Sequence, residues 1–132
     1  MKNFSLLLLL FIASFGYAQT EVAKTPQIVF KIGLGDTVTN DGIKIQFEEM
    51  LEDSRCPVNV QCVWAGQARV KVNISGPDMP EESLDLIVGK KDKNVLCTVN
   101  GYILKAMTLA PYPDTTNTEI KEYVLFILKE KV

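Results

Sequence analysis

The chain has 132 residues and a formal charge of -2, and 47% of its residues are hydrophobic, which indicates one small globular domain. It carries no surplus of basic residues that could neutralise phosphates, so we expect no nucleic-acid partner. The absence of histidine from the sequence excludes Ser-His-Asp and Cys-His catalysis and every histidine-ligated metal centre. We therefore expect a protein that is not an enzyme and that needs no cofactor or metal.

The first 18 residues have the pattern of a secretory signal peptide. Lys2 precedes an apolar run over residues 4–12, and the small residues Gly16 and Ala18 occupy the positions that signal peptidase requires. The apolar run is shorter than the roughly 20 residues that a membrane-spanning helix needs. We expect cleavage after Ala18, a secreted or periplasmic protein, and no membrane span.

The chain after the cleavage site divides into a flexible polar lead-in over residues 19–26 and a single domain over 27–132. Apolar and polar residues alternate along the domain, which is typical of strands with one buried face. Strands are predicted over residues 27–32, 43–47, 68–74, 84–88, 95–99, 102–109 and 123–128. Sustained helical periodicity is absent from the sequence after the leader.

Two segments suggest how these strands assemble. Asn100-Gly101 separates two predicted strands and is a strong hairpin signal, because both residues tolerate a positive φ. Residues 123–128 are apolar on both faces, as in a strand that is central in its sheet or covered on its outer side. The pattern predicts an all-β, antiparallel β-sandwich of immunoglobulin-like type with about seven strands, and a small barrel is the less favoured alternative.

Three cysteines, Cys56, Cys62 and Cys97, allow three possible single disulfides. Cys56 and Cys62 share one short loop, so we expect them to be bonded, which removes about 2.4 kcal/mol of unfolded-chain entropy for a loop of this length. Cys97 shares a strand face with Val95 and Val99, and we expect it to be a buried, free and poorly reactive thiol. A reactive thiol or a soft-metal ligand is the less favoured role.

The segment over residues 52–70 holds most of the unusual residues, and two interpretations compete for it. In the structural one, Trp64 packs on the disulfide and closes one end of the sandwich, and Asp53 and Arg55 pair or cap loop backbone groups. In either one, Gly66 shortly before a strand suggests a bulge or a positive-φ corner. In the functional one, the stapled loop is a recognition surface with Trp64 and Arg55 as its anchors. We favour the packed form of Trp64.

The order of residues in this segment resembles a known pattern. The run DSRCP over 53–57 and the run CVWAGQARV over 62–70, with LAPYP at 109–113 and a closing apolar strand, is similar to a family of small secreted bacterial proteins. Its members carry the signature DSRCP-x4-C-x-W-x-G-x-A on a β-sandwich. The resemblance implies secretion, this fold and the Cys56–Cys62 bridge. It carries over no catalytic or ligand residues.

Tyr112 lies between two prolines in a stiff, extended segment that leaves a predicted strand. One interpretation is a crossover between strands in which Tyr112 packs on the edge of the sandwich. The other is a rigid binding loop in which Tyr112 contacts a partner. Tyr112 therefore joins Arg55 and Trp64 as a candidate interaction residue.

An acidic cluster precedes the stapled segment, and it consists of Glu48, Glu49, Glu52 and Asp53. Such a cluster could supply the paired carboxylates that catalyse glycoside hydrolysis, or the oxygen ligands that bind calcium. Consecutive residues of a strand point to opposite faces, and the spacing fits no calcium loop. We expect a solvated acidic edge.

These observations favour a secreted, non-enzymatic β-sandwich that binds an unidentified protein or contributes to an envelope assembly. A secreted proteinase inhibitor that presents rigid loops is the alternative, because a stapled loop lowers the entropy cost of binding. A carboxylate-based hydrolase is a third, weaker hypothesis.

Overall fold

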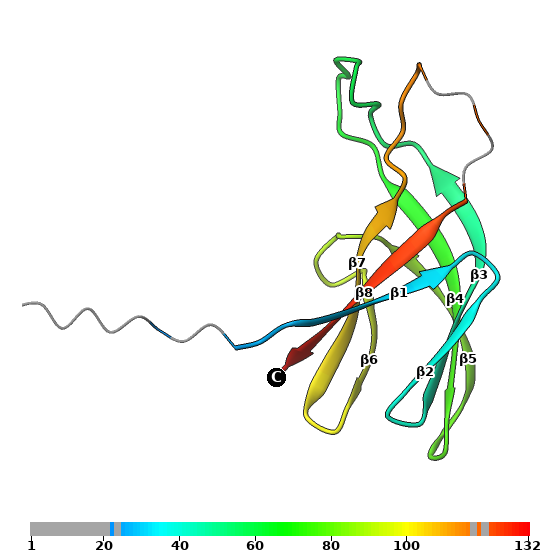
Figure 1. Ribbon diagram of the computed structural model, residues 1–132, viewed down its shortest axis with the longest axis vertical. Coiled ribbons are helices and arrows are strands. Elements are labelled where there is room, and N and C mark those ends of the chain that lie inside the picture. The colour runs from blue at the N-terminus through cyan, green and yellow to red at the C-terminus, as the bar shows by residue number, and fades with distance from the viewer. Residues whose placement is uncertain (1–21, 23–24, 117–118, 120–121) are drawn as a thin grey trace, which may run out of the picture.

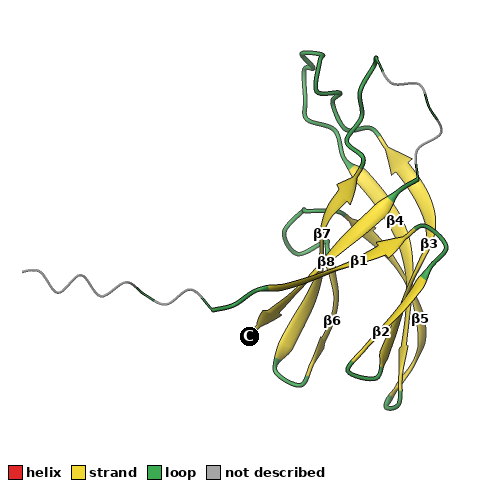
Figure 2. Cartoon of the chain, in the orientation of Figure 1, coloured by secondary structure: helices red, strands yellow, loops and turns green. Residues whose placement is uncertain are grey.

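The computed structural model describes residues 22, 25–116, 119 and 122–132. The predicted signal peptide and most of the lead-in lie outside these residues. The described part forms two four-stranded antiparallel sheets and contains no helix (Figures 1 and 2). The expected all-β sandwich is confirmed, with eight strands rather than about seven.

Both sheets draw strands from distant parts of the chain. The first sheet has the order β1 (Ile28–Gly33), β8 (Val124–Lys131), β7 (Tyr102–Ala110) and β6 (Val95–Val99). The second has the order β2 (Thr37–Asn40), β3 (Ile43–Asp53), β4 (Ala68–Gly76) and β5 (Met79–Ile87). The chain therefore passes between the sheets after β1 and again after β5.

The core lies between the two sheets and follows the period-two pattern of the sequence. In β3 and β4, every second side chain from Ile43 to Phe47 and from Ala68 to Ile74 is buried. The doubly apolar strand β8 is central, between β1 and β7, as expected for a strand without a polar face. Fifteen buried hydrophobic residues form the core of the described part: Ile32, Ile43, Ile45, Phe47, Ala68, Val70, Val72, Ile74, Leu86, Leu96, Leu104, Ala106, Leu109, Leu125 and Ile127.

The predicted hairpin turn is present, and several strands are longer than predicted. Asn100 and Gly101 both have positive φ in the β6–β7 hairpin, as predicted. Strand β5 begins at Met79 and includes Pro80, whereas the predicted strand begins only at residue 84. A proline is tolerated there because β5 is an edge strand with one side free of ladder hydrogen bonds. The short edge strand β2 was not predicted.

Two loops project beyond the sandwich at the same end of the molecule (Figure 1). We call residues 54–67, between β3 and β4, the stapled loop, and residues 111–116, after β7, the proline segment. The described residues include no helix that is long and apolar enough to cross a membrane. The two projecting loops contain all three of the predicted interaction residues, so the candidate site lies at this end.

Candidate functional site

The stapled loop is closed by covalent and hydrogen bonds. Cys56 and Cys62 form a disulfide with a Cα–Cα distance of 5.9 Å, in agreement with the predicted pairing. Below it, the two arms of the loop are joined by hydrogen bonds of 2.9 Å from Ser54 N to Gln67 O and from Cys56 N to Ala65 O. The loop is therefore a narrow stalk that continues the pairing of β3 with β4.

Gly66 makes the close approach of the two arms possible. Its φ is +69°, which confirms the positive-φ corner. A Cβ atom at this position would lie 1.8 Å from the backbone oxygen of Ser54. Only glycine fits here without displacing the backbone of the opposite arm.

Asp53 and Arg55 form an ion pair at the base of the stalk. Arg55 Nε donates to Asp53 Oδ1 at 2.8 Å, and Arg55 Nη2 donates to Asp53 Oδ2 at 2.9 Å. The two side chains are 11% and 13% exposed, so the pair is largely shielded from water. The pairing that the structural interpretation expected is confirmed, and the guanidinium of Arg55 faces inward rather than toward a partner.

The same guanidinium reaches across to the other sheet. Arg55 Nη1 donates to the carbonyl of Leu109 at 2.6 Å, and Nη2 donates to the carbonyl of Pro111 at 3.0 Å. The ring of Tyr112 lies over the guanidinium, with 4.9 Å between Arg55 Cζ and the ring centroid. Tyr112 therefore packs on Arg55 with one face, yet about half of its surface stays exposed.

Tyr123 completes this group of contacts, and its hydroxyl donates to Asp53 Oδ2 at 3.0 Å. We call Asp53, Arg55, Tyr112 and Tyr123 the Arg55 cluster. Burial raises the pKa of Asp53, but the hydrogen bonds and charge of Arg55 and the hydroxyl of Tyr123 outweigh this effect and hold the pKa below its ordinary value. Burial and the neighbouring carboxylate raise the pKa of Tyr123.

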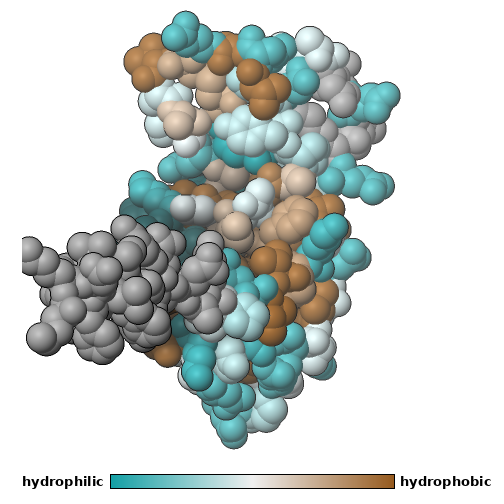
Figure 3. Space-filling view, turned by 60° about the vertical axis from the view of Figure 1, so that its left-hand side comes forward, coloured by the Kyte–Doolittle hydropathy of each residue, from teal (hydrophilic) through white to brown (hydrophobic). Residues whose placement is uncertain are grey.

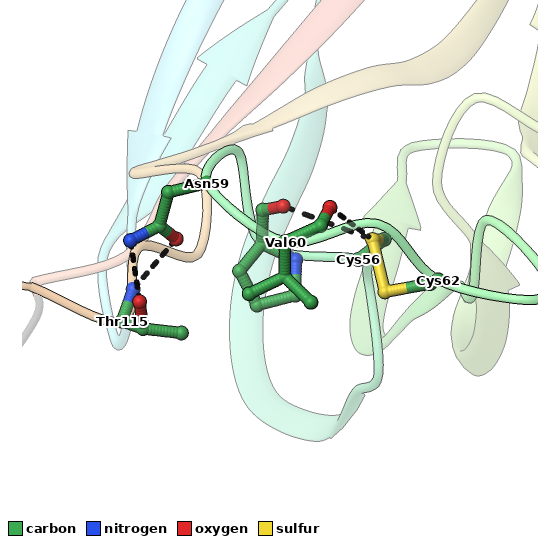
Figure 4. Close-up of a disulfide and its surroundings, with 6 residues drawn as sticks. Cys56, Asn59, Val60, Cys62 and Thr115 are labelled. Carbon is green, nitrogen blue, oxygen red and sulfur yellow. Dashed lines mark hydrogen bonds between the residues drawn. A yellow bond between two sulfur atoms is a disulfide. The ribbon is translucent and has the colours of Figure 1, made fainter.

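The outer parts of the two loops are also hydrogen-bonded to each other (Figure 4). Asn59 Nδ2 donates to Thr115 Oγ1, and Thr115 N donates to Asn59 Oδ1 at 3.3 Å. Val58 N donates to the carbonyl of Pro113 at 3.1 Å. Together with the Arg55 cluster, these bonds make the stapled loop and the proline segment one unit.

The expectation that Trp64 is packed and closes one end of the sandwich is wrong. Its side chain is 64% exposed. The physical reason is that the Arg55 cluster already occupies the end of the sandwich, where Asp53 of β3 meets Tyr123 before β8. The stalk then carries Trp64 outward, beyond this polar closure.

Trp64 belongs to a larger group of exposed apolar side chains on the two loops. We call Val58, Val60, Val63, Trp64 and Tyr112 the apolar tip; all five are exposed, and they are five of the eleven exposed large hydrophobic residues in the described part. Apolar side chains at this outer end appear brown in Figure 3. The three valines were not singled out from the sequence, although an uncharged run over residues 56–67 was a signal that could have found them.

A groove of about 440 Å³ lies below the tip, between the stapled loop and the ends of β4 and β5. Arg55, Trp64 and Tyr112, the three candidate interaction residues, all contribute to its lining. Gln67 and Lys90 were not predicted and line it as well. The three candidate residues therefore lie on one surface. Trp64 and Tyr112 are exposed there, whereas Arg55 is largely buried.

Cys97 differs in part from its expected setting. It is a free thiol, but it is half-buried, not fully buried. A register shift between Val95 and Cys97 in the β6–β7 pairing leaves Leu96 as the buried residue of this strand, while Cys97 packs at the edge of the core. Burial raises the pKa of the Cys97 thiol, which disfavours the reactive thiolate.

The acidic residues do not converge on the groove. Glu48 and Glu49 are both exposed because a β-bulge interrupts β3 between Phe47 and Glu49. Glu52 accepts hydrogen bonds from Ser54 and Gln67, and Asp53 belongs to the Arg55 cluster. Among the described residues, no group of three or more Cys, Asp or Glu side chains is placed to hold a metal ion.

Searches against protein-family models, curated proteins and solved structures give no match. The resemblance drawn from the signature residues therefore stays a prediction.

Proposed function

We propose that the protein is a secreted or periplasmic, non-enzymatic binding domain that recognises an envelope component through the end of the sandwich that carries the apolar tip and the groove. The observation that carries the proposal is the exposure of Trp64 and Tyr112 on loops that are fixed in place. Exposed aromatic residues on a rigid scaffold are typical of binding surfaces, because little entropy is lost when they bind.

The free polar groups of the groove support the same interpretation. Within the described residues, the indole N–H of Trp64, the hydroxyl of Tyr112 and the ammonium of Lys90 have no hydrogen-bond or ion-pair partner, and all three residues line the groove. A binding surface combines apolar area with a few polar groups that orient the ligand. The end of the sandwich offers both.

A Trp64→Ala variant tests this proposal. The immobilised secreted protein should capture its partner from cell-envelope extracts, and Trp64→Ala should abolish capture without loss of folding. Val132→Ala is the control, because Val132 is also an exposed apolar residue and lies beside the β6–β7 turn, away from the tip. Equal capture by the wild type and Trp64→Ala would contradict the proposal.

A secreted proteinase inhibitor is the second candidate, and the narrow projecting stalk is the observation that favours it (Figure 1). A convex loop held by a disulfide can enter a protease cleft and resist cleavage there. Inhibition of a panel of secreted proteinases, with the stapled loop left intact, would support this candidate. Cleavage within residues 56–62 at the rate of a denatured control would contradict it.

A further inference from the structure

The apolar tip offers a more specific inference about the partner, and this inference rests on the proposed function. We propose that the tip inserts into the interfacial layer of a zwitterionic lipid membrane, with the valines of the stapled loop entering the bilayer and Trp64 and Tyr112 at headgroup level. Val63 is fully exposed and Val58 is 67% exposed. Trp and Tyr prefer this interface, because one part of each side chain is apolar and the other can stay hydrated.

The exposure of the tip is built into the fold. The Cys56–Cys62 disulfide and the Asn59–Thr115 contacts hold the loop outward (Figure 4). The bond from Val58 N to Pro113 O adds to them. The valines cannot turn back to the core, which is already filled between the sheets. Because the loop is ordered before binding, insertion loses little conformational entropy.

The charge distribution favours a zwitterionic membrane over an anionic one. Residues 56–67 contain no charged side chain, and Arg55 is paired with Asp53. The other charges near the tip have opposite signs: Lys90 lines the groove, and Asp114 lies in the proline segment. The chain as a whole has a formal charge of -2. Attraction to anionic lipid needs a cluster of basic residues, and the tip has none.

The size and shape of the tip favour a lipid surface over a protein interface. A stable protein complex buries about 800 Å² on each partner, drawn from roughly 20 residues or more. The apolar tip has five exposed side chains on two loops that project at one end of the molecule (Figure 1), where Figure 3 shows hydrophilic side chains beside the apolar ones. A small convex apolar end can enter a bilayer without any matching cavity.

Trp64 is the sole tryptophan of the chain, so its fluorescence reports directly on the tip. The secreted protein is mixed with phosphatidylcholine vesicles, and binding is followed by Trp64 emission and by co-sedimentation. We expect the emission of Trp64 to shift to the blue, to be protected from iodide and to be quenched by brominated lipid. Half of the protein should be bound near 0.1 mM lipid, an affinity on the order of that given by a single acyl chain. Raising NaCl from about 0.1 to about 1 M should leave the binding unchanged.

Val63→Asp should weaken vesicle binding by about tenfold or more, because a carboxylate must then be desolvated. The thermal midpoint should not change, since Val63 touches solvent alone. Val132→Asp adds the same charge to an exposed valine beside the β6–β7 turn and should bind like the wild type. Equal weakening by both variants would overturn the proposal, as it would assign the effect to net charge.

Three further outcomes would also overturn it. The first is the absence of a blue shift at about 1 mM phosphatidylcholine, which is tenfold above the expected midpoint of binding. The second is binding that requires anionic lipid and disappears in high salt. The third is vesicle binding that the Val63→Asp substitution leaves intact. If vesicles do not bind while envelope capture still depends on Trp64, the lipid inference fails and the proposed binding function stands. If neither vesicles nor extracts respond to Trp64→Ala, both fail.

Discussion

The guanidinium of Arg55 holds the carboxylate of Asp53 by two hydrogen bonds, of 2.8 and 2.9 Å, at the point where the stapled loop leaves β3. The same guanidinium binds the carbonyl of Leu109 in β7, so a single side chain connects the two sheets. An arginine suits this place because its planar fork donates in several directions at once. The position of the exposed apolar tip therefore depends on the largely buried Arg55 cluster beneath it.

Arg55→Ala should destabilise the fold by about 3 kcal/mol, because Asp53 would keep a buried charge without its partner. Arg55→Lys should cost about 1 to 2 kcal/mol, since an ammonium retains the charge but not the fork. Both values would come from urea unfolding. Lys105→Ala is the control: it breaks a more exposed pair with Glu130 and should cost less than about 1 kcal/mol. Equal losses for Arg55→Ala and Lys105→Ala would contradict the role given to the Arg55 cluster.

The ion pair should also make stability depend on pH in the acid range. The folded pKa of Asp53 lies below its ordinary value, so the stabilisation is complete above the unfolded value of about 3.9 and is lost as pH falls through the lower folded pKa. Asp53→Asn removes the titrating group. The difference in unfolding free energy between wild type and Asp53→Asn should be constant near neutral pH and shrink below about pH 4. A difference that does not change down to about pH 2 would contradict this prediction.

The sandwich was predictable because burial on one face imposes a period of two. The alternation in Ile43–Phe47 and 68–74 appears in the structure as buried side chains that alternate with exposed or half-buried ones. Strand limits were less predictable, because edge strands need little burial: β2 has four residues, and β5 accepts Pro80. The acidic edge was expected to be solvated, with Glu48 and Glu49 on opposite faces. Both are exposed because of the register shift in β3, which leaves no mark in the apolar pattern of the sequence.

Gly66→Ala should be among the most damaging single changes in the loop. The added Cβ meets the backbone oxygen of Ser54 at 1.8 Å, and a backbone atom cannot rotate away, so we expect a loss of about 3 kcal/mol or displacement of the stalk. Gly101→Ala is the matched control, since its φ of +77° is similar and nothing lies within 4 Å of its Cβ position. It should cost about 1 kcal/mol from backbone strain alone. Similar losses, measured by thermal unfolding, would contradict the steric explanation.

The disulfide should contribute local order more than global stability. Replacement of Cys56 and Cys62 by serine should cost about 2 kcal/mol, the chain entropy of a loop of this length. The core should remain folded, because the Arg55 cluster lies below the bridge. Proteolysis should become faster within residues 57–61, while Cys97→Ser should leave the loop unaffected. Non-reducing peptide mapping that links Cys97 to either loop cysteine would contradict the pairing.

The position of Trp64 shows what sequence reasoning could not supply. A tryptophan two residues from a half-cystine suggests packing on the bridge, and that inference assumed that the end of the sandwich was open. Tyr123 joins the predicted Asp53–Arg55 pair there from a position 70 residues away from Asp53 in the chain, and local spacing gives no sign of this contact. With the end already closed by polar groups, the indole has no apolar cavity to fill.

Trp64→Ala should therefore change the free energy of unfolding by less than about 0.5 kcal/mol, the usual range for surface substitutions. A tryptophan that closed the core would instead lose about 3 to 5 kcal/mol. The free protein should show red-shifted emission that iodide quenches readily, because the indole is 64% exposed. If the emission of the free protein were blue-shifted and protected from iodide, Trp64 would be packed in the core and this prediction would be wrong. Folded stability near that of the wild type, combined with lost partner capture, would assign the residue to binding alone.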